Sequence, residues 1–150
     1  MAKYAYPAIF TPAKADEGGY VITFPDFDGA TQGEDLTDAI EMATDYLNCT
    51  ICDYEDEKNE IPRATNINKL KVPQNGFVNM ILADTEAYKE VIERENNPIR
   101  YARKKAKLNI KQLADLLEAP YRTVQDWNAG RKRPASWVEK LVIEKIESVM

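Results

Sequence analysis

The segment from Leu108 to Gly130 constrains the fold most, because its pattern predicts two short amphipathic helices joined by a tight turn. Asn109 is a favourable N-cap for the first helix, since its side chain can accept hydrogen bonds from the unpaired amides of the first turn. Apolar residues recur in this helix at spacings of three and four and predict its inward face: Ile110, Leu113, Ala114 and Leu117. The small side chain of Ala114 lets a second helix cross closely.

Pro120 suits the start of the second helix, where its missing amide donor costs little. Val124 and Trp127 are expected to point inward, with Tyr121 one turn earlier on the same side. Glycine commonly ends helices, and Gly130 is expected to end this one. The same geometry leaves four polar residues facing outward: Arg122, Thr123, Gln125 and Asp126.

This outward face predicts DNA binding. A recognition helix presents such a surface to the major groove, where arginine can make a bidentate contact to guanine and glutamine to adenine. Phosphate contacts set affinity and register, and the residues expected to make them are Lys111, Gln112, Arg131, Lys132 and Arg133. The alternative is a helical bundle with a solvated basic face. A basic run alone would favour that bundle, but two capped helices, an inward apolar pair and a following basic loop favour DNA binding.

The charge of the chain is divided between its two halves. Residues 98–150 hold 12 lysines and arginines against 6 aspartates and glutamates, a net charge of +6. Residues 1–97 hold 8 against 19, a net charge of −11, which leaves −5 for the whole chain. The change near residues 95–98 predicts two modules with different partners. We expect domains at residues 1–95 and 98–150, the second all-α with five short helices.

The N-terminal half is predicted to be an α+β module in the order β-β-β-α-β-α. Strands are expected at residues 4–11, 19–24, 30–33 and 77–82, and helices from about residue 36 into residues 55–60 and at 85–95. Asp35 and Asp84 are the expected helix N-caps. The expected hairpin turn comprises Asp16, Glu17, Gly18 and Gly19. The first helix should bury one apolar stripe: Leu36, Ile40, Ala43, Leu47, Ile51 and Tyr54.

Composition limits the remaining chemistry. The chain has no histidine and two cysteines, Cys49 and Cys52, which offer fewer soft ligands than a zinc site needs. We therefore expect no zinc site. We also expect no other metal, no cofactor and no catalytic residue. No apolar run approaches the roughly 18 residues that would cross a bilayer, and the N-terminus lacks an apolar signal core, so we expect a cytoplasmic protein without a membrane partner.

Residues 98–147 resemble the lambda-repressor-like helix-turn-helix family of the Cro or XRE type. The resemblance depends on short matches: Gln112-Leu113-Ala114, Thr123-Val124, Trp127, Gly130 and Arg133-Pro134. Three residues depart from the family pattern, because Glu118 replaces the turn glycine, Pro120 the serine or threonine cap and Asn128 a common glutamate. The resemblance implies that five residues face the bases: Tyr121, Arg122, Thr123, Gln125 and Asp126. Asn128 completes the expected DNA-contacting set.

The N-terminal half resembles the HicB antitoxin family over about residues 3–85. The matching motifs are Pro25-Asp26-Phe27-Asp28-Gly29, Thr31-Gln32-Gly33-Glu34 and the helix that contains Asp38-Ala39. The resemblance implies a partial ribonuclease H-like fold without catalysis. It also implies a small basic partner, the HicA toxin, which cleaves messenger RNA. A strongly acidic domain fits such a partner, because opposite charges speed encounter.

Several alternatives stay open at this stage. An active ribonuclease H-like nuclease would need carboxylates to converge on metal ions, and the candidates are Asp16, Asp26, Asp28, Glu34 and Asp84. A repressor that senses a small ligand is the other alternative. Residues 25–33 can be a turn kept for folding, and the acidic helix face can simply be solvated. We expect a homodimer or a higher oligomer. The last helix either pairs the copies or closes the core of its domain, and its apolar residues are Val138, Leu141, Val142 and Ile146.

Overall fold

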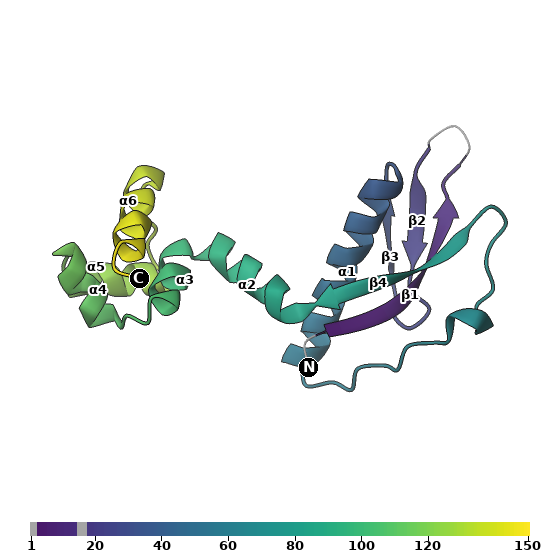
Figure 1. The fold of residues 1–150 in the computed structure, drawn as a ribbon, viewed down its shortest axis with the longest axis horizontal. Helices are drawn as coiled ribbons and strands as arrows, with labels where there is room; N and C mark the ends of the chain where they lie inside the picture. The colour runs from purple at the N-terminus through teal and green to yellow at the C-terminus, as the bar shows by residue number, and fades with distance from the viewer. Residues whose placement is uncertain (1–2, 15–17) are drawn as a thin grey trace. The chain divides into compact units, whose positions relative to one another are not determined.

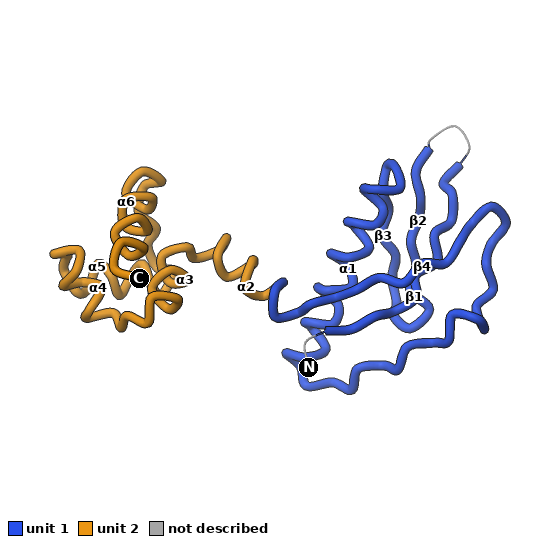
Figure 2. The backbone as a smooth tube through the Cα atoms, in the orientation of Figure 1, with its two compact units in different colours: residues 1–88 blue, residues 89–150 orange. Residues whose placement is uncertain are grey.

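The computed structural model describes residues 3–14 and 18–150. The chain divides into two compact units, residues 1–88 and 89–150 (Figure 2). The division falls inside helix α2 (Thr85–Asn96), earlier in the chain than the expected boundary at residues 95–98. Most of α2 therefore belongs to the C-terminal unit.

The N-terminal unit is a four-stranded antiparallel sheet with helix α1 (Leu36–Asp56) packed on it (Figure 1). The strands lie in the order β3-β2-β1-β4. Their bounds are β1 (Lys3–Pro12), β2 (Tyr20–Thr23), β3 (Ala30–Gly33) and β4 (Phe77–Asp84). A short 3-10 turn, η1 (Ile67–Lys69), lies between α1 and β4. The expected order β-β-β-α-β-α is confirmed.

Strand β1 lies between β2 and β4, and its pairing explains why it can contain a proline. It pairs with β4 over Lys3–Phe10 and with β2 over Ile9–Pro12, so Pro7 lies where β1 has a single partner strand. A proline is tolerated there because it removes no ladder hydrogen bond on the unpaired side.

In the expected turn between β1 and β2, Gly18 and Gly19 have positive φ angles of 66° and 81°. Asp16 and Glu17 of that turn lie outside the described residues.

Helix α1 starts at the expected cap and buries a stripe that begins later than expected. The Asp35 carboxylate accepts a hydrogen bond from the backbone amide of Asp38 at 2.8 Å. Four side chains at intervals of four residues are fully buried against the sheet: Ala39, Ala43, Leu47 and Ile51. The prediction that Leu36 is buried is wrong, because Leu36 is 46% exposed. The helix approaches β3 so closely at Ala39 that this small residue takes the inner position.

The C-terminal unit is built from helices around a separate core. After α2 come α3 (Pro98–Lys105), α4 (Ile110–Leu117), α5 (Tyr121–Ala129) and α6 (Ser136–Glu147). Their buried side chains form one cluster: Ile99, Ala102, Leu113, Ala114, Val124, Val142 and Ile146. The prediction of five helices within residues 98–150 is wrong, since there are four. Asn97 caps α3 directly after α2 ends, so the fifth helix of this unit precedes Pro98.

Helix α6 divides its apolar residues between the core and the surface. Val142 and Ile146 are buried and close the core, as one alternative from the sequence held. Val138 is partly buried. Leu141 and the neighbouring Trp137 are 55% and 68% exposed. One face of α6 therefore remains apolar and open.

Both cysteines lie within α1, where Cys49 is exposed and Cys52 is buried. Among residues 3–14 and 18–150, no three histidine, cysteine, aspartate or glutamate side chains gather closely enough to hold a metal ion. In the same part of the chain, no helix is long and apolar enough to cross a membrane.

Candidate nucleic-acid interface

A reciprocal pair of hydrogen bonds fixes the start of α4. The Asn109 side chain accepts from the backbone amide of Gln112 at 2.7 Å, and Gln112 Oε1 accepts from the Asn109 amide at 2.8 Å. This capping box satisfies two otherwise unpaired donors and confirms the expected N-cap. Gln112 itself is exposed at the start of the helix.

The turn between α4 and α5 contains two of the three residues that depart from the helix-turn-helix pattern, Glu118 and Pro120. Glu118 adopts the left-handed conformation, with φ 53° and ψ 38°, at the position where the family has glycine. This conformation costs a residue with a β-carbon roughly 1–2 kcal/mol. Pro120 is extended, and its carbonyl accepts hydrogen bonds from the amides of Thr123 and Val124. The two helices and the tight connection therefore form without the usual glycine and hydroxyl cap.

Helix α5 is held in place along its inner side. Val124 is fully buried in the cluster that contains Leu113 and Ala114 of α4, and Trp127 packs against the same cluster. The inward orientation of Val124 and Trp127 is thus confirmed. At the other end of α5, Asn128 accepts a hydrogen bond from Arg103 Nε at 3.0 Å. Asn128 is half-buried and lies where α3 contacts α5.

Four of the five residues expected to face bases lie at the surface in the first turns of α5. The Arg122 side chain is 77% exposed, and Tyr121 is 47% exposed. Thr123 and Gln125 are partly exposed. The structure therefore brings one guanidinium, one amide, one hydroxyl and one phenol to the same stretch of helix surface.

Asp126 is the exception. It is only 5% exposed, so the prediction that it faces outward is wrong. Its Oδ1 accepts a hydrogen bond from Arg131 Nε at 2.9 Å and lies 3.4 Å from Arg122 Nε, while Oδ2 lies 3.9 Å from Lys132 Nζ. The hydrogen bond from Arg131 is the main cause that holds the pKa of the Asp126 carboxyl below its usual range.

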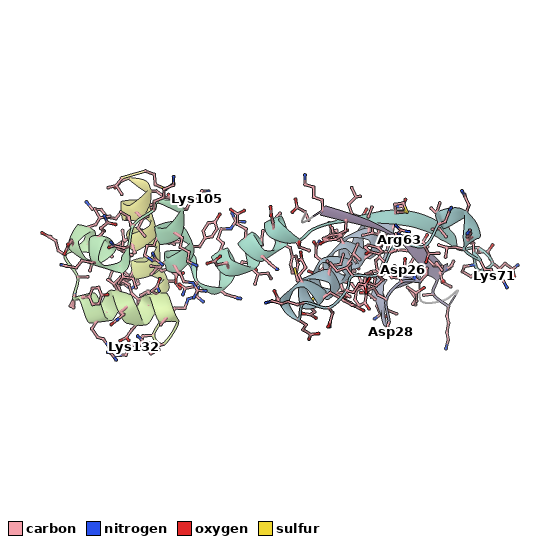
Figure 3. The ribbon with its side chains drawn as sticks, turned by 90° about the horizontal axis from the view of Figure 1, so that it is seen from below. Asp26, Asp28, Arg63, Lys71, Lys105 and Lys132 are labelled. Atoms are coloured by element: carbon pink, nitrogen blue, oxygen red, sulfur yellow. The ribbon has the colours of Figure 1, made fainter. Side chains whose placement is uncertain are left out.

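Gly130 explains why Asp126 is covered. Its φ of 78° turns the chain back at the end of α5, which confirms the expected helix end. The backbone amides of Arg131 and Lys132 then donate to the Asp126 carbonyl, at 3.0 and 3.4 Å. The basic loop thus folds over the last turn of α5, with the side chains of Arg131 and Lys132 53% and 77% exposed. Figure 3 shows Lys132 projecting from this unit, on a different side from Lys105.

Besides Arg131 and Lys132, which lie near Asp126, two further residues expected to contact phosphates have acidic partners. Arg133 donates from Nε and Nη2 to the two carboxylate oxygens of Glu139, at 3.1 and 3.2 Å, and this hydrogen bonding raises the pKa of Arg133. Lys111 Nζ lies 2.8 Å from Asp115 Oδ1. Both cations would exchange these partners to contact a phosphate. Lys132 is the cation of the set with the weakest ion pair and the most exposed side chain.

In the N-terminal unit, the motif at residues 25–29 makes structural contacts. Both Asp26 carboxylate oxygens accept from the Thr65 amide at 3.1 Å, and Oδ1 also accepts from the Thr65 hydroxyl at 2.5 Å (Figure 3 shows Asp26). The Tyr46 hydroxyl donates to the Asp28 carbonyl. A β-carbon on Gly29 would lie 2.6 Å from the Tyr46 hydroxyl oxygen. These contacts support the turn-for-folding alternative for this motif.

Helix α1 presents an acidic surface. It contains six aspartates and glutamates and no lysine or arginine. Glu41, Asp45 and Asp53 are exposed. Tyr88 lies against this surface, where burial, followed by the charge of Asp45, raises its pKa to about 12. Such a surface attracts a basic partner.

Some residues of these sites were missed from the sequence. Thr65 carried no signal, because its partner Asp26 is distant in the sequence. Trp137 was not predicted to be exposed beside Leu141, although their spacing of four residues places them on one helix face.

Comparisons with known proteins agree with this architecture. A family model described as a HicB-like antitoxin of a bacterial toxin-antitoxin system matches residues 5–73. The chain is 35% identical over 96 residues to "Antitoxin HicB" of Escherichia coli strain K12, covering 60% of this chain and 67% of that protein. The same figures hold for "Antitoxin HicB" of Escherichia coli O157:H7.

Among solved structures, a chain of the "Toxin-Antitoxin complex from Streptococcus pneumoniae" has a similar fold. The TM-score is 0.53 at 23% sequence identity, and the match covers 87% of this chain and 99% of that one. The sequence similarity to the curated antitoxins and the match of the family model to the acidic N-terminal unit lead to one conclusion: the chain belongs to the HicB-like antitoxin family.

Proposed function

We propose that the chain is an antitoxin that binds and neutralises a HicA-type, messenger RNA-cleaving toxin and represses its own operon by binding operator DNA. Residues 1–95 would bind the toxin and residues 98–150 the DNA. The observation that carries the proposal is the match of the HicB-like family model to the acidic N-terminal unit. We also propose that the sheet and α1 form a partial ribonuclease H-like fold without catalysis.

The toxin side of the proposal is supported by charge. Residues 1–97 have a net charge of −11, and α1 carries only acidic charges. A ribonuclease has a basic surface because it binds RNA phosphates, so this domain would attract that surface and exclude RNA from it. The similarity to a chain from a toxin-antitoxin complex supports such a partner.

The DNA side is supported by the arrangement of α4, α5 and the basic loop. Arg122 and Gln125 lie on the surface of α5, where an arginine can read guanine and a glutamine can read adenine. Arg131 and Lys132 follow in the loop and would contact phosphates, with Lys111 and Gln112 at the start of α4. Both proposed partners, the toxin and the operon, would place the chain in the bacterial cytoplasm.

We propose that the chain acts on DNA as a homodimer or a higher oligomer. Helices of this kind usually read two half-sites about 34–36 Å apart. Val142 and Ile146 are used in the core, so α6 would pair through its exposed residues Trp137 and Leu141.

The direct test is to co-express the full chain with the small open reading frame beside its gene. We expect the two proteins to purify as a complex, the toxin alone to cleave messenger RNA and the complex not to. The full chain should also bind the DNA upstream of its gene in a fluorescence anisotropy titration. If the two proteins form no complex and the full chain does not restore the growth of cells that express the toxin, the chain is not an antitoxin. If a metabolite releases the chain from DNA, and the ratio of toxin to antitoxin does not change its affinity for DNA, a ligand-sensing repressor is favoured.

A further inference from the structure

One buried carboxylate contacts two of the arginines that the proposed DNA interface uses. Arg122 lies at the start of α5 and Arg131 in the loop after it, and both approach Asp126 Oδ1 through Nε, at 3.4 and 2.9 Å. We propose that Asp126 is a positioning residue that orients Arg122 toward the bases and Arg131 toward the phosphate backbone. This inference rests on the proposed operator binding.

The mode of contact supports positioning. An arginine held through Nε keeps its two terminal nitrogens, which are the donors that form the bidentate contact to guanine. The side chains of Arg122 and Arg131 stay 77% and 53% exposed while the Asp126 side chain is 8% exposed. The carboxylate is thus at the bottom of the arrangement, and the guanidinium groups extend from it to the surface.

Asp126 itself is a poor candidate for a DNA contact. It is 5% exposed, and as a carboxylate it would repel phosphates. Three cations surround it, and the hydrogen bond from Arg131 keeps its pKa low, so it is charged at neutral pH. A long arginine side chain loses rotamer freedom when it is immobilised on DNA. Ordering by Asp126 before binding removes part of that cost.

The inference makes a prediction opposite to simple electrostatics. Removing one negative charge from a DNA-binding surface should tighten binding to every sequence, because DNA is a polyanion. Removing a positioning carboxylate should instead weaken binding to the preferred sequence. The sign of the change in affinity for the preferred sequence therefore separates the two accounts.

The experiment uses the full chain and a DNA duplex that the wild-type chain selects from a random library. Affinities for this duplex and for an unselected duplex are measured by fluorescence anisotropy at two salt concentrations. We expect Asp126→Asn to lower the affinity for the selected duplex by about tenfold or more, the size of one lost base contact. The affinity for the unselected duplex should stay equal or rise.

Asp115→Asn is the matched control. Asp115 is also a carboxylate of the two-helix segment, but its side chain is 65% exposed and pairs with Lys111, at the start of α4. We expect this variant to bind both duplexes as tightly as wild type or more tightly. In an Arg122→Ala background, Asp126→Asn should cause a much smaller loss of preference, because one of the two arginines that Asp126 positions is absent. Asp126→Glu, which keeps the carboxylate, should retain most of the preference.

Three results would overturn the inference. Asp126→Asn can bind the selected duplex as tightly as wild type or more tightly, which leaves only the electrostatic effect. It can lose both duplexes in parallel with a lower thermal midpoint, and then Asp126 only stabilises the fold. If the wild-type chain selects no sequence, the proposed operator binding fails and the inference fails with it. That last result differs from the others because it appears before any variant is made.

Discussion

Gly33 and Ala39 lie in direct backbone contact. A β-carbon built on Gly33 would be 2.4 Å from both the nitrogen and the Cα of Ala39, far inside any normal contact distance. Gly33 ends β3 and Ala39 lies in the first turns of α1. The glycine of the Thr-x-Gly motif is therefore needed for α1 to reach the sheet.

Gly33→Ala should destabilise the N-terminal unit by about 1–3 kcal/mol, because the added methyl group overpacks a rigid backbone contact. Both tryptophans, Trp127 and Trp137, lie in the C-terminal unit. The urea midpoint measured by near-ultraviolet circular dichroism of the tyrosines should therefore fall, while the midpoint measured by tryptophan fluorescence should not change. Gly18→Ala is the control, since its β-carbon would meet nothing within 4 Å and only its positive φ adds cost. A Gly33→Ala protein as stable as wild type would contradict the contact.

Asp26→Asn should loosen the segment around Thr65. The amide side chain keeps one acceptor oxygen but loses the hydrogen bonds to a charged carboxylate. This loss should lower the stability of the segment by about 1–3 kcal/mol. Amide hydrogen exchange at Thr65 and protease cleavage near it should both become faster. Asp28→Asn is the matched control, because the Asp28 side chain is exposed and the hydrogen bond from Tyr46 goes to the Asp28 carbonyl. Unchanged exchange at Thr65 would show that Asp26 does not hold this segment.

Glu118→Gly should stabilise the C-terminal unit by roughly 0.5–1 kcal/mol. Glycine relieves the left-handed strain at φ 53° but gains more freedom in the unfolded chain, so the two effects partly cancel. Glu144→Gly, at an exposed position inside α6, should lose about 1 kcal/mol instead. Tryptophan fluorescence during urea unfolding measures both variants. A loss of stability in Glu118→Gly would be evidence against the left-handed turn.

The stability of the C-terminal unit should fall at acidic pH because of Asp126. Its pKa is depressed in the folded chain, so its contribution is complete above the unfolded value of about 3.9 and is lost as the pH falls through the folded value. We expect the difference in thermal midpoint between wild type and Asp126→Asn to be largest near neutral pH. Below about pH 4 the difference should shrink. A difference that does not change with pH would mean that the charge of Asp126 does not contribute.

The features that sequence alone predicted are local. The caps at Asp35 and Asn109 and the helix end at Gly130 each depend on atoms within a few residues, so residue type and spacing are sufficient. The strand order along the chain followed from alternation and turn residues for the same reason. The HicB-like motif led to the correct family because it combines several such local signals.

The features that sequence missed depend on tertiary contacts. Asp126 faces outward on an isolated helix and becomes buried only because the chain reverses at Gly130 and places Arg131 over it. Leu36 fits the apolar stripe by spacing, but α1 approaches the sheet at Ala39 instead. The count of helices was wrong because the change of charge placed the domain limit after α2, whereas most of α2 belongs to the C-terminal unit and is its fifth helix.

The most direct test of the proposed division of labour is the full-chain double variant Arg122→Ala and Gln125→Ala, assayed for both functions. We predict that it purifies with the toxin and restores growth as wild type does. Its affinity for the operator should fall by roughly a hundredfold, from the loss of two base contacts. A folded variant that loses both functions, or one that keeps operator binding, would contradict the assignment of DNA recognition to α5.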